Sequence, residues 1–424
     1  MNKNENNQGF CAFANSFQAV TVPGLERIGM LCKLLGNPEN RLKIIHVAGT
    51  NGKGSTCACL SSIFQNAGFK VGKYISPNLL KVNERISICD EDISDAELNR
   101  LLERLEPLCI TVQKKLGLAP TQFEIWTAAA FLYFAEQDCD YVILEVGLGG
   151  EFDATNVIDR CELSVITRLG VDHTQYLGSS IEKIASAKAG IIKRKQTVDA
   201  VITVKQEESA LRIIEERATQ LGKRLIAADP KPLGAEGAFE RFALSGIGEI
   251  KCGISGYHQI ENAALAAIAA KELGVASEHI ISGIAMAKNP ARFEIIRDND
   301  PVVIYDGGHN ENGIAALTAS LDRYYPNRKI TVVFACMKDK DISQSLKMLS
   351  KRCTHFIFTT VKNNPRADTA AGVKKRAAEL GYASEAFEEI SDAYQAAIAR
   401  GELTVICGSL YLYKDLCEYL KKNI

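Results

Sequence analysis

The chain has 424 residues, which is long for one compact core and predicts two or three domains. Its 50 basic and 51 acidic side chains nearly cancel, so no basic excess points to nucleic acid and no polybasic tract points to a membrane surface. The polar residues 1–9 lack the apolar stretch of a secretory signal, and no apolar run approaches the roughly 20 residues that span a bilayer. We therefore expect a cytoplasmic protein that binds neither nucleic acid nor membrane.

Thirteen cysteines are scattered singly through apolar segments, and an odd number cannot pair completely. Cys57 and Cys59 are the only close pair, and their single intervening residue is not the two-residue spacing of a zinc knuckle. We predict reduced thiols in a reducing compartment and no structural disulfide.

Short apolar runs rich in β-branched residues alternate with helical patterns over the first part of the chain. Strands are predicted at residues 43–48, 71–76, 141–146 and 163–167, and helical patterns cover residues 121–137 and 179–192. Apolar runs of this length are typical of parallel strands that are covered on both faces. The alternation predicts an open α/β domain.

A second alternation follows an Ala-rich helical pattern at residues 261–273 and a charged, aperiodic segment at residues 289–301 that contains two prolines. Its predicted strands are residues 302–305, 330–335, 356–360 and 404–407, with helices at residues 343–352 and 373–380. We therefore predict a larger domain at 1–290, a linker at 291–300 and a smaller α/β domain at 301–424. Ligands are expected in a cleft between the two domains.

The sharpest motif is the glycine-rich segment GTNGKGST at residues 49–56, which follows a predicted strand and opens a helix. This context predicts an anion site, because backbone N–H groups and the helix dipole both favour negative charge. Lys53 is expected to reach the outer phosphates, and Ser55 or Thr56 to orient phosphate or metal. Gly54 separates the lysine from the hydroxyls, so the loop is not a standard Walker A sequence. A flexible glycine-rich turn is the alternative interpretation.

Three side chains that can bind a metal follow the predicted parallel strands. Ser76 ends the second strand, Glu145 ends the third, and His173 lies just past the fourth. Because the carboxyl ends of parallel strands meet at one edge of a sheet, all three are expected at the same mouth, where a divalent cation neutralises a phosphoryl group in transit. Taken singly, Glu145 is also consistent with a turn carboxylate, and His173 with a structural histidine.

Five motifs occur together and in order: the loop at 49–56, EVGLGG at 145–150, DATN at 153–156, KAGIIK at 188–193 and DGGHN at 306–310. On these motifs the chain resembles, from about Pro23 to its C-terminus, the folylpolyglutamate synthase and dihydrofolate synthase branch of the Mur ligase superfamily. The resemblance implies an N-terminal P-loop, Mur-ligase-like ATPase domain with a mostly parallel sheet. It also implies a smaller C-terminal Rossmann-like α/β domain.

The implied activity is a ligase reaction. L-glutamate is added to the γ-carboxyl group of a tetrahydrofolate (poly)glutamate through an acyl phosphate, and ATP is converted to ADP and phosphate. The resemblance implies Mg²⁺ as the cofactor. The family is usually monomeric, so we expect a monomer whose partners are reduced folate, L-glutamate and ATP.

The resemblance also assigns roles to individual residues. The residues implied to bind ATP are Asn51, Gly52, Lys53, Gly54, Ser55, Asn262, Arg292, Asp306 and His309. Those implied to bind magnesium are Ser76, Glu145 and His173, and those implied to take part in catalysis are Lys53, His173 and Lys188. Lys188 matches a lysine that is carbamylated in the family. Those implied to bind the folate are Gly24, Leu25, Glu26, Phe123, Glu124 and Phe152. A surface arginine is the alternative for Arg292, and ordinary core packing is the alternative for Phe123.

A few positions depart from the family pattern. Members that make dihydrofolate usually read Ser-Pro-His-Leu after the second strand, whereas Asn78 stands here after Ser76 and Pro77. Ala291 stands where a glycine is common before the linker arginine. The departure at Asn78 leaves dihydrofolate synthase activity open.

Three rival functions remain from the sequence. One is a bifunctional enzyme that also joins dihydropteroate to glutamate, and another is a Mur-type ligase that acts on a cell-wall precursor. The third is a nucleotide-binding regulatory module without catalysis, against which the combined presence of Lys53, Glu145, His173 and Lys188 argues.

Overall fold

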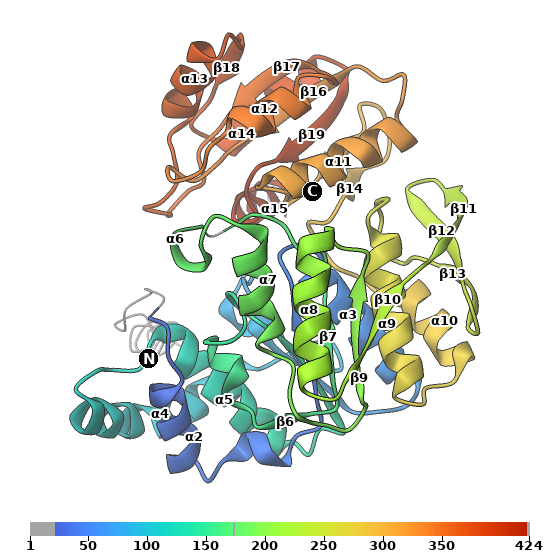
Figure 1. The fold of residues 1–424 in the computed structure, drawn as a ribbon. Coiled ribbons are helices and arrows are strands. Elements are labelled where there is room, and N and C mark those ends of the chain that lie inside the picture. The colour runs from blue at the N-terminus through green and yellow to red at the C-terminus, as the bar shows by residue number, and fades with distance from the viewer. Residues whose placement is uncertain (1–21, 173, 422–424) are drawn as a thin grey trace. The chain divides into compact units, whose positions relative to one another are not determined.

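The computed structural model describes residues 22–172 and 174–421, which form two compact units, each with its own central sheet (Figure 1). The first unit contains the described residues up to Pro232 together with residues 242–251 and 261–288. The second contains residue 289 onward, and it also takes residues 233–241 and 252–260. The sequence did not predict these two inserted stretches.

The first unit is built on an eight-stranded sheet in the order β10-β9-β7-β1-β5-β2-β3-β4. Its strands are β1 (Ile44–Ala48), β2 (Val71–Tyr74), β3 (Ile86–Ile88), β4 (Glu91–Asp92), β5 (Tyr141–Glu145), β7 (Leu163–Ile166), β9 (Ala200–Val204) and β10 (Arg224–Ala228). The strands from β10 to β2 pair in parallel, and β3 and β4 add an antiparallel edge. Every residue of β1 is buried, as expected for a central strand covered on both faces.

The register of the sheet brings the predicted site segments to one edge. Val47 pairs with Glu145, Ala48 with Ile166, and Tyr74 with Leu144. The chain therefore leaves β1, β5, β7 and β2 at nearly the same height. This edge is the carboxyl end of parallel strands, where ligands bind in open α/β sheets.

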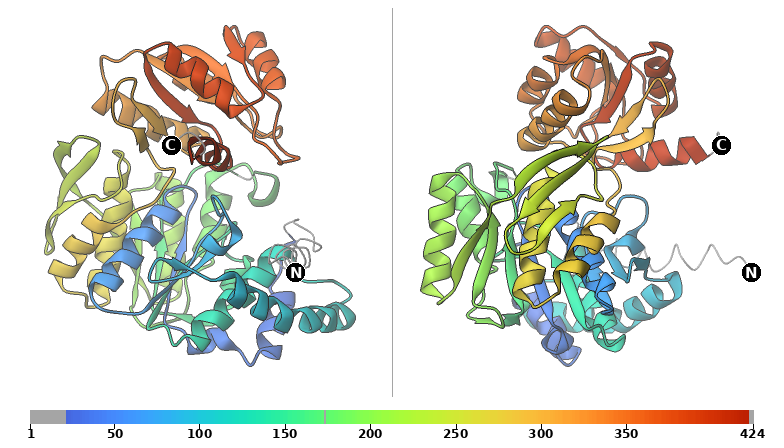
Figure 2. Two further views of the ribbon diagram at one scale, coloured as in Figure 1. Left: turned by 180° about the vertical axis from the view of Figure 1, so that it is seen from behind. Right: turned by 90° about the vertical axis from the view of Figure 1, so that its right-hand side faces the viewer.

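Helices cover both faces of this sheet. They are α2 (Glu26–Leu34), α3 (Lys53–Asn66), α4 (Asp95–Leu116), α5 (Gln122–Glu136), α6 (Thr174–Leu177), α7 (Ile181–Ala189), α8 (Glu208–Gln220), α9 (Gln259–Glu272) and α10 (Ser277–Met286). Figures 1 and 2 show α4, α5, α7 and α8 on one face and α3, α9 and α10 on the other. Two apolar clusters fill the first face, one under α2, α4 and α5 and one under α7 and α8.

Smaller elements complete the first part of the chain. Three short 3₁₀ helices are η1 (Pro38–Arg41), η2 (Val82–Arg85) and η3 (Ala154–Val157). Two small sheets contain β6 (Arg160–Cys161) with β8 (Lys195–Gln196), and β11 (Lys231–Glu236) with β12 (Phe239–Leu244) and β13 (Gly248–Lys251).

The second unit has a six-stranded sheet in the order β14-β15-β19-β16-β17-β18, in which only β14 is antiparallel. Its elements are β14 (Glu294–Arg297), β15 (Val303–Tyr305), α11 (Glu311–Tyr324), β16 (Ile330–Phe334), α12 (Ser343–Leu349), β17 (Cys353–Phe358), α13 (Ala370–Glu379), β18 (Ser384–Ala386), α14 (Ile390–Ala399), β19 (Leu403–Cys407) and α15 (Leu412–Lys421). The predicted α/β class, with a mostly parallel N-terminal sheet and a separate C-terminal sheet, is confirmed.

The segment at 289–301, which was predicted to be a linker because it is charged and aperiodic, contains strand β14, which pairs with β15. Four residues flanked by charges are too few to show a strand period in the sequence.

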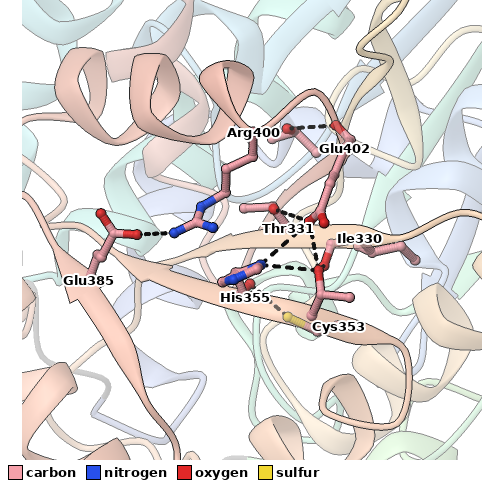
Figure 3. A network of polar contacts seen from close by, with 9 residues as sticks. Ile330, Thr331, Cys353, His355, Glu385, Arg400 and Glu402 are labelled. Carbon is pink, nitrogen blue, oxygen red and sulfur yellow. Dashed lines mark hydrogen bonds and ion pairs between the residues drawn. The ribbon is translucent and has the colours of Figure 1, made fainter.

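A partly buried carboxylate joins three strands of the second unit at their amino ends (Figure 3). Glu402, just before β19, accepts hydrogen bonds through Oε2 from the hydroxyls of Thr331 on β16 (2.7 Å) and Thr354 on β17 (2.6 Å). His355 Nδ1 lies 3.6 Å from the same oxygen. The three strands are thus tied together by side chains in addition to their backbone ladder.

Two further observations concern the whole of the described chain. None of its helices has both the length and the hydrophobicity needed to cross a bilayer. Every cysteine among residues 22–172 and 174–421 is a free thiol.

Candidate active site

The glycine-rich loop connects the central strand β1 to the amino end of α3. Gly49 and Gly52 adopt φ values of 149° and 89°, which side chains rarely allow. A Cβ atom at Gly52 would lie 2.1 Å from Asn262 Oδ1, so only glycine permits the close approach of α9 to the loop. Gly52 caps α3 without a side-chain hydrogen bond, and Lys53 is the first helical residue. The loop therefore has the geometry of an anion site at a helix amino end.

The loop is supported from β7 by residues that the sequence analysis did not single out. The carbonyl of Arg168 accepts hydrogen bonds from the N–H groups of Thr50 and Asn51, both at 3.1 Å. The hydroxyl of Thr167 donates to the carbonyl of Asn51 at 2.7 Å. These contacts fix the backbone orientation of the loop, and those of Arg168 use main-chain atoms alone, which leave no sequence signal.

Two lysines lie at the loop. Lys53 Nζ is 3.4 Å from the carbonyl of Thr50, whereas Lys188 Nζ, from α7, donates to the carbonyl of Gly49 at 2.8 Å. Lys188 is buried, and burial, together with the nearby charge of Lys53, lowers its pKa to about 7. Asp172 and Asp153 oppose this effect. The amine of Lys188 is consequently neutral in a large fraction of molecules at neutral pH.

Glu145 ends β5 on the face of the sheet that carries α3. Its carboxylate is buried, and Oε2 accepts a hydrogen bond from the backbone N–H of Ser76 at 3.0 Å. The structure thus brings together two of the three predicted metal residues. The third, His173, lies outside the described residues.

The donor set at this edge fits magnesium better than a metal held by a full protein cage. Among the described residues, no three His, Cys, Asp or Glu side chains cluster in a way that could hold a metal ion. Glu145 and Ser76 offer one carboxylate and one hydroxyl. Magnesium is usually bound through one or two carboxylates and keeps waters and substrate phosphates as its other ligands. The residues present therefore fit Mg²⁺ at a phosphate site.

Phe123, at the start of α5, lies against the turn that follows Glu145. A Cβ atom at Gly147 would be 2.5 Å from Phe123 Cζ, and the ring centroid of Phe123 is 5.9 Å from that of Tyr74. Phe123 is half-buried. Phe152, on the next turn, is 59% exposed.

Glu124 is buried, and its carboxylate takes part in contacts within the protein. It closes a capping box at the amino end of α5, where its Oε2 accepts a hydrogen bond from the N–H of Thr121 at 2.6 Å. The same oxygen accepts from Arg27 Nε at 3.0 Å in a buried ion pair. This pair holds the start of α2, so that Leu25 caps that helix and Glu26 is exposed beside Gly24.

The remaining predicted nucleotide residues belong to the second unit. Asp306 follows β15 and accepts hydrogen bonds from the N–H groups of Phe293 (2.8 Å) and Gly308 (2.7 Å). His309 Nδ1 lies 3.0 Å from the carbonyl of Gly307. Arg292 Nη1 would lie 3.1 Å from a Cβ atom at Gly307, so Asp306, His309 and Arg292 form one local group.

Comparison with known proteins identifies the class. The family model for the Mur ligase middle domain matches residues 47–270, and the model for the Mur ligase glutamate ligase domain matches residues 291–410. These two domains, together with the phosphate loop and its lysines, define the chain as an ATP-dependent Mur-type ligase.

Full-length relatives narrow the class. The chain is 36% identical to the dihydrofolate synthase/folylpolyglutamate synthase of Bacillus subtilis (strain 168), with 94% of this chain and 95% of that protein covered. It is 32% identical to the folylpolyglutamate synthase of Lacticaseibacillus casei, with 95% of each chain covered. The structure of Mycobacterium tuberculosis folylpolyglutamate synthase complexed with ADP and AMPPCP superposes with a TM-score of 0.90 at 28% identity and 99% coverage of both chains. The chain belongs to the folylpolyglutamate synthase/dihydrofolate synthase family.

Proposed function

We propose that this chain joins L-glutamate to the γ-carboxyl group of a tetrahydrofolate (poly)glutamate, with ATP as the second substrate. The observation that carries the proposal is the loop at 49–56, which places Lys53 at the amino end of α3. The loop follows strand β1, which pairs with the strand that ends at Glu145. The names of the relatives support the folate and glutamate substrates. The ADP and AMPPCP in the related structure support ATP.

The first step is phosphoryl transfer. A γ-carboxylate oxygen of the folate attacks the γ-phosphorus of ATP, the bond to the β-phosphate oxygen breaks, and ADP leaves. Charge spreads over the phosphoryl oxygens in this transition state, so its stabilisation depends on fixed positive groups. Backbone N–H groups at the start of α3 and the ammonium of Lys53 supply them. Asn262 keeps the loop in this shape by packing against Gly52.

Glu145 and Ser76 would hold Mg²⁺, and His173 is the third proposed ligand. A bound magnesium ion neutralises part of the charge that develops on the phosphoryl group. The buried carboxylate of Glu145 is already oriented by the N–H of Ser76, so it needs little rearrangement to bind a cation.

The second step forms the amide. The neutral amino group of L-glutamate attacks the acyl carbon, the carbon–oxygen bond to phosphate breaks, and the nitrogen loses a proton to a base or to water. We propose Lys188, carried as a carbamate, as an anionic group beside the loop. A lysine whose pKa is near 7 has the neutral amine that attacks carbon dioxide.

The bifunctional alternative has equal support from the names of the relatives. The Bacillus subtilis relative is named for both activities, whereas the Lacticaseibacillus casei relative is named for folylpolyglutamate synthesis alone. ADP release measured with tetrahydrofolate, 5,10-methylene-tetrahydrofolate and dihydropteroate, each with and without L-glutamate, separates the two functions. Glutamate-dependent turnover with dihydropteroate would establish the second activity.

The proposal is tested by replacing the loop lysine. Lys53→Ala should leave a folded protein whose folate-dependent ADP release falls at least about 100-fold, because one fixed cation of the transition state is lost. Lys195→Ala removes a lysine that is 68% exposed and should leave turnover unchanged. Near-normal turnover of Lys53→Ala would remove the phosphate-loop assignment.

Other features follow as parts of the same proposal. The ATP-binding domain is proposed to span 1–290, the linker 291–300 and the C-terminal domain 301–424. Folate contacts are proposed for Gly24, Leu25, Glu26, Phe123, Glu124 and Phe152, of which Phe123 is half-buried and Phe152 is exposed. We also propose a cytoplasmic monomer.

A further inference from the structure

A histidine in the centre of the first sheet has no role in the reaction described above. His46 lies on β1, three residues before Gly49, and none of its surface is exposed. Its side chain lies on the same face of the sheet as that of Ile44, because side chains alternate along a strand. There Nε2 lies 2.9 Å from the hydroxyl of Thr155, whereas the buried Nδ1 has no hydrogen-bond partner.

The neighbouring hydrogen bonds determine which ring nitrogen of His46 carries the proton. The hydroxyl of Thr155 donates its single proton to Asp153 Oδ1, at 2.6 Å. It can therefore only accept from His46, so Nε2 carries the proton and Nδ1 carries the lone pair. Burial and the nearby charge of Lys193 hold the pKa of His46 well below its usual range, which keeps the ring neutral. Apart from Asp153, reached through Thr155, Lys193 is the charged group that acts on this ring.

The carboxylate of Asp153 connects Thr155 to the turn after Glu145 by hydrogen bonds. Its Oδ2 accepts a hydrogen bond from the N–H of Leu148 at 2.8 Å, and its Oδ1 accepts from the N–H of Thr155 at 3.0 Å. The backbone of Gly147 also hydrogen-bonds to the same carboxylate. The carboxylate therefore holds the turn at 147–150 by its main chain.

The turn has almost no freedom to move between two residues of the proposed site. At Gly147, the ring of Phe123 lies 2.5 Å from where a Cβ would be. At Gly150, the carbonyl of Ala187 lies 2.6 Å, and Lys188 Cα 3.0 Å, from where a Cβ would be. A shift of the turn would therefore displace Phe123 on one side and Lys188 on the other.

We propose that His46 is a positioning residue, which acts through the hydroxyl of Thr155 and the carboxylate of Asp153 to hold the turn at 147–150 against Phe123 and Lys188. The inference rests on the proposed function only in assigning folate binding and catalysis to those two neighbours. The relay of hydrogen bonds itself follows from the three residues and their distances.

A purely structural role does not account for this histidine. A buried acceptor without a partner is unfavourable, and Nδ1 of His46 is such an atom. An aliphatic residue at this position of a central strand would remove that penalty. A histidine at this position has an advantage only through its Nε2–H group, which donates a hydrogen bond to the hydroxyl of Thr155.

Two matched pairs of variants test the relay through activity. His46→Leu removes the donor, whereas His46→Gln supplies an amide N–H in its place. Thr155→Val removes the hydroxyl with little change of shape, and Thr155→Ser retains it. We expect kcat to fall about 10- to 100-fold in the Leu and Val variants, with a raised KM for the folate. The Gln and Ser variants should stay within about threefold of the wild type.

Binding and stability separate positioning from folding. The affinity for ADP, measured by calorimetric titration, should be unchanged in all four variants, and the melting temperature of His46→Leu should be equal or higher. The kcat of the double variant His46→Leu, Thr155→Val should be no lower than that of the less active single variant, because both substitutions break the same relay. Multiplicative losses in the double variant, or full activity of Thr155→Val, would overturn the proposal.

The tautomer provides a readout that does not depend on the ligase reaction. In protein labelled with ¹⁵N at its six histidines, with His46 assigned by its loss in His46→Gln, the ring should be neutral with the proton on Nε2 from pH 5.5 to 8.5. A proton on Nδ1, or an ordinary titration near pH 6.5, would overturn the relay. If the wild type had no folate-dependent turnover, the proposed function would fall while this spectrum would still decide the relay.

Discussion

At the scale of single residues, Lys188 has the most unusual environment in the candidate site. It is buried, donates to the carbonyl of Gly49 and has a pKa of about 7. Because the folded-state pKa is lowered, the neutral amine predominates above pH 7 and the ammonium below it. A carbamate forms from the neutral amine, so its formation should become easier as the pH rises through 7.

This chemistry gives the first prediction. Lys188→Ala should lose about 100-fold in turnover, and short carboxylates such as acetate should partly restore it by occupying the vacated space. Wild-type enzyme freed of carbon dioxide should regain activity on addition of bicarbonate, and the activation should be greater at pH 8 than at pH 6. Lys188→Gln is the matched control, since its side chain fills the space and should block rescue. Full activity of Lys188→Ala without additive would contradict the carbamate.

Ala291 is a second residue in an unfavourable state. Its φ of 60° lies in the left-handed region, as does the φ of 44° at Phe293, and Arg292 stands between them. The left-handed conformation costs a residue with a Cβ about 1–2 kcal/mol. The family commonly has glycine at position 291, which avoids this penalty.

Ala291→Gly should therefore stabilise the second unit by about 0.5–1 kcal/mol, after the greater backbone entropy of unfolded glycine is taken into account. The midpoint of urea-induced unfolding measures the change. Ala378→Gly is the opposite control, because Ala378 is exposed in the helix α13 and its loss should destabilise by about 0.5–1 kcal/mol. A destabilised Ala291→Gly variant would show that the strain is absent.

The positions of some candidate site residues could be predicted from topology. Glu145 ends a parallel strand, Lys53 and Ser76 lie shortly after two others, and the register brings their segments to one edge. Their roles in binding stay predictions. The partners of these residues could not be predicted. The ion pair of Glu124 with Arg27 spans 97 positions of the chain, and the support of the loop by Arg168 uses a carbonyl group. In the sequence, Asp153 and Thr155 stand out only as part of the motif DATN at 153–156.

At the scale of elements, the eight strands predicted from apolar runs match strands of the structure within one to three residues at each end. The apolar strand β9 (Ala200–Val204) was not predicted. The sequence failed where elements are short or polar, as at β14 and the hairpin β11–β12, because four to six mixed residues carry little periodicity. Polar side chains also hold strands that apolar runs mark. Glu402 is an example, since it ties β16, β17 and β19 at their amino ends (Figure 3).

The Glu402 network gives a prediction with a defined pH dependence. Burial alone raises the pKa of Glu402, but the hydrogen bonds from Thr354 and Thr331 and the charge of His355 outweigh it, and the pKa is lowered. Glu402→Ala should destabilise the second unit by about 1–2 kcal/mol at pH 7, because it leaves the buried hydroxyl of Thr331 without its acceptor, whereas that of Thr354 keeps the carbonyl of Ile330 at 3.0 Å.

The sign of the pH effect follows from the lowered pKa. The stabilisation is fully present above the ordinary glutamate value of 4.5 and is lost as the pH falls through the folded-state value below it. The difference between wild type and Glu402→Ala in urea unfolding should therefore shrink at pH 3. Glu385→Ala is the control, because this 46% exposed partner of Arg400 should contribute less than about 1 kcal/mol. A difference that is the same at pH 3 and pH 7 would contradict the assignment.

At the scale of the whole molecule, the second unit is assembled from three separate stretches of chain. The stretch 233–241 contributes Glu240, none of whose surface is exposed. Its carboxylate accepts hydrogen bonds from Arg323 (3.0 Å from Nη2) and from the hydroxyl of Tyr324 (2.6 Å), both in α11. The stretch 252–260 contributes Ser255, whose hydroxyl donates to the carbonyl of Phe293 at 2.7 Å.

A substitution at Glu240 should therefore lower the stability of the second unit, although Glu240 is far in sequence from most of that unit. Glu240→Gln is expected to destabilise the second unit by about 1–3 kcal/mol, because Arg323 and Tyr324 lose a charged acceptor. Amide hydrogen exchange should accelerate in α11 (Glu311–Tyr324) and stay unchanged in α3 (Lys53–Asn66). Glu236→Gln, at a 54% exposed residue of the same stretch, should leave both helices protected. Faster exchange confined to α3 would refute this account.

The order in which the ribosome makes these stretches has a consequence for biogenesis. Strand β19 is the last strand synthesised, yet it lies between β15 and β16 in the middle of the second sheet. At ~5–20 residues per second, roughly 10–35 s separate the emergence of residue 233 from that of β19. During this interval the loop at 49–56 has already been synthesised. Strands β15 and β16 of the second sheet still lack β19, which lies between them in the folded protein. A chain released early from the ribosome would thus expose unpaired strand edges, and such species should be the ones that chaperones and proteases recognise.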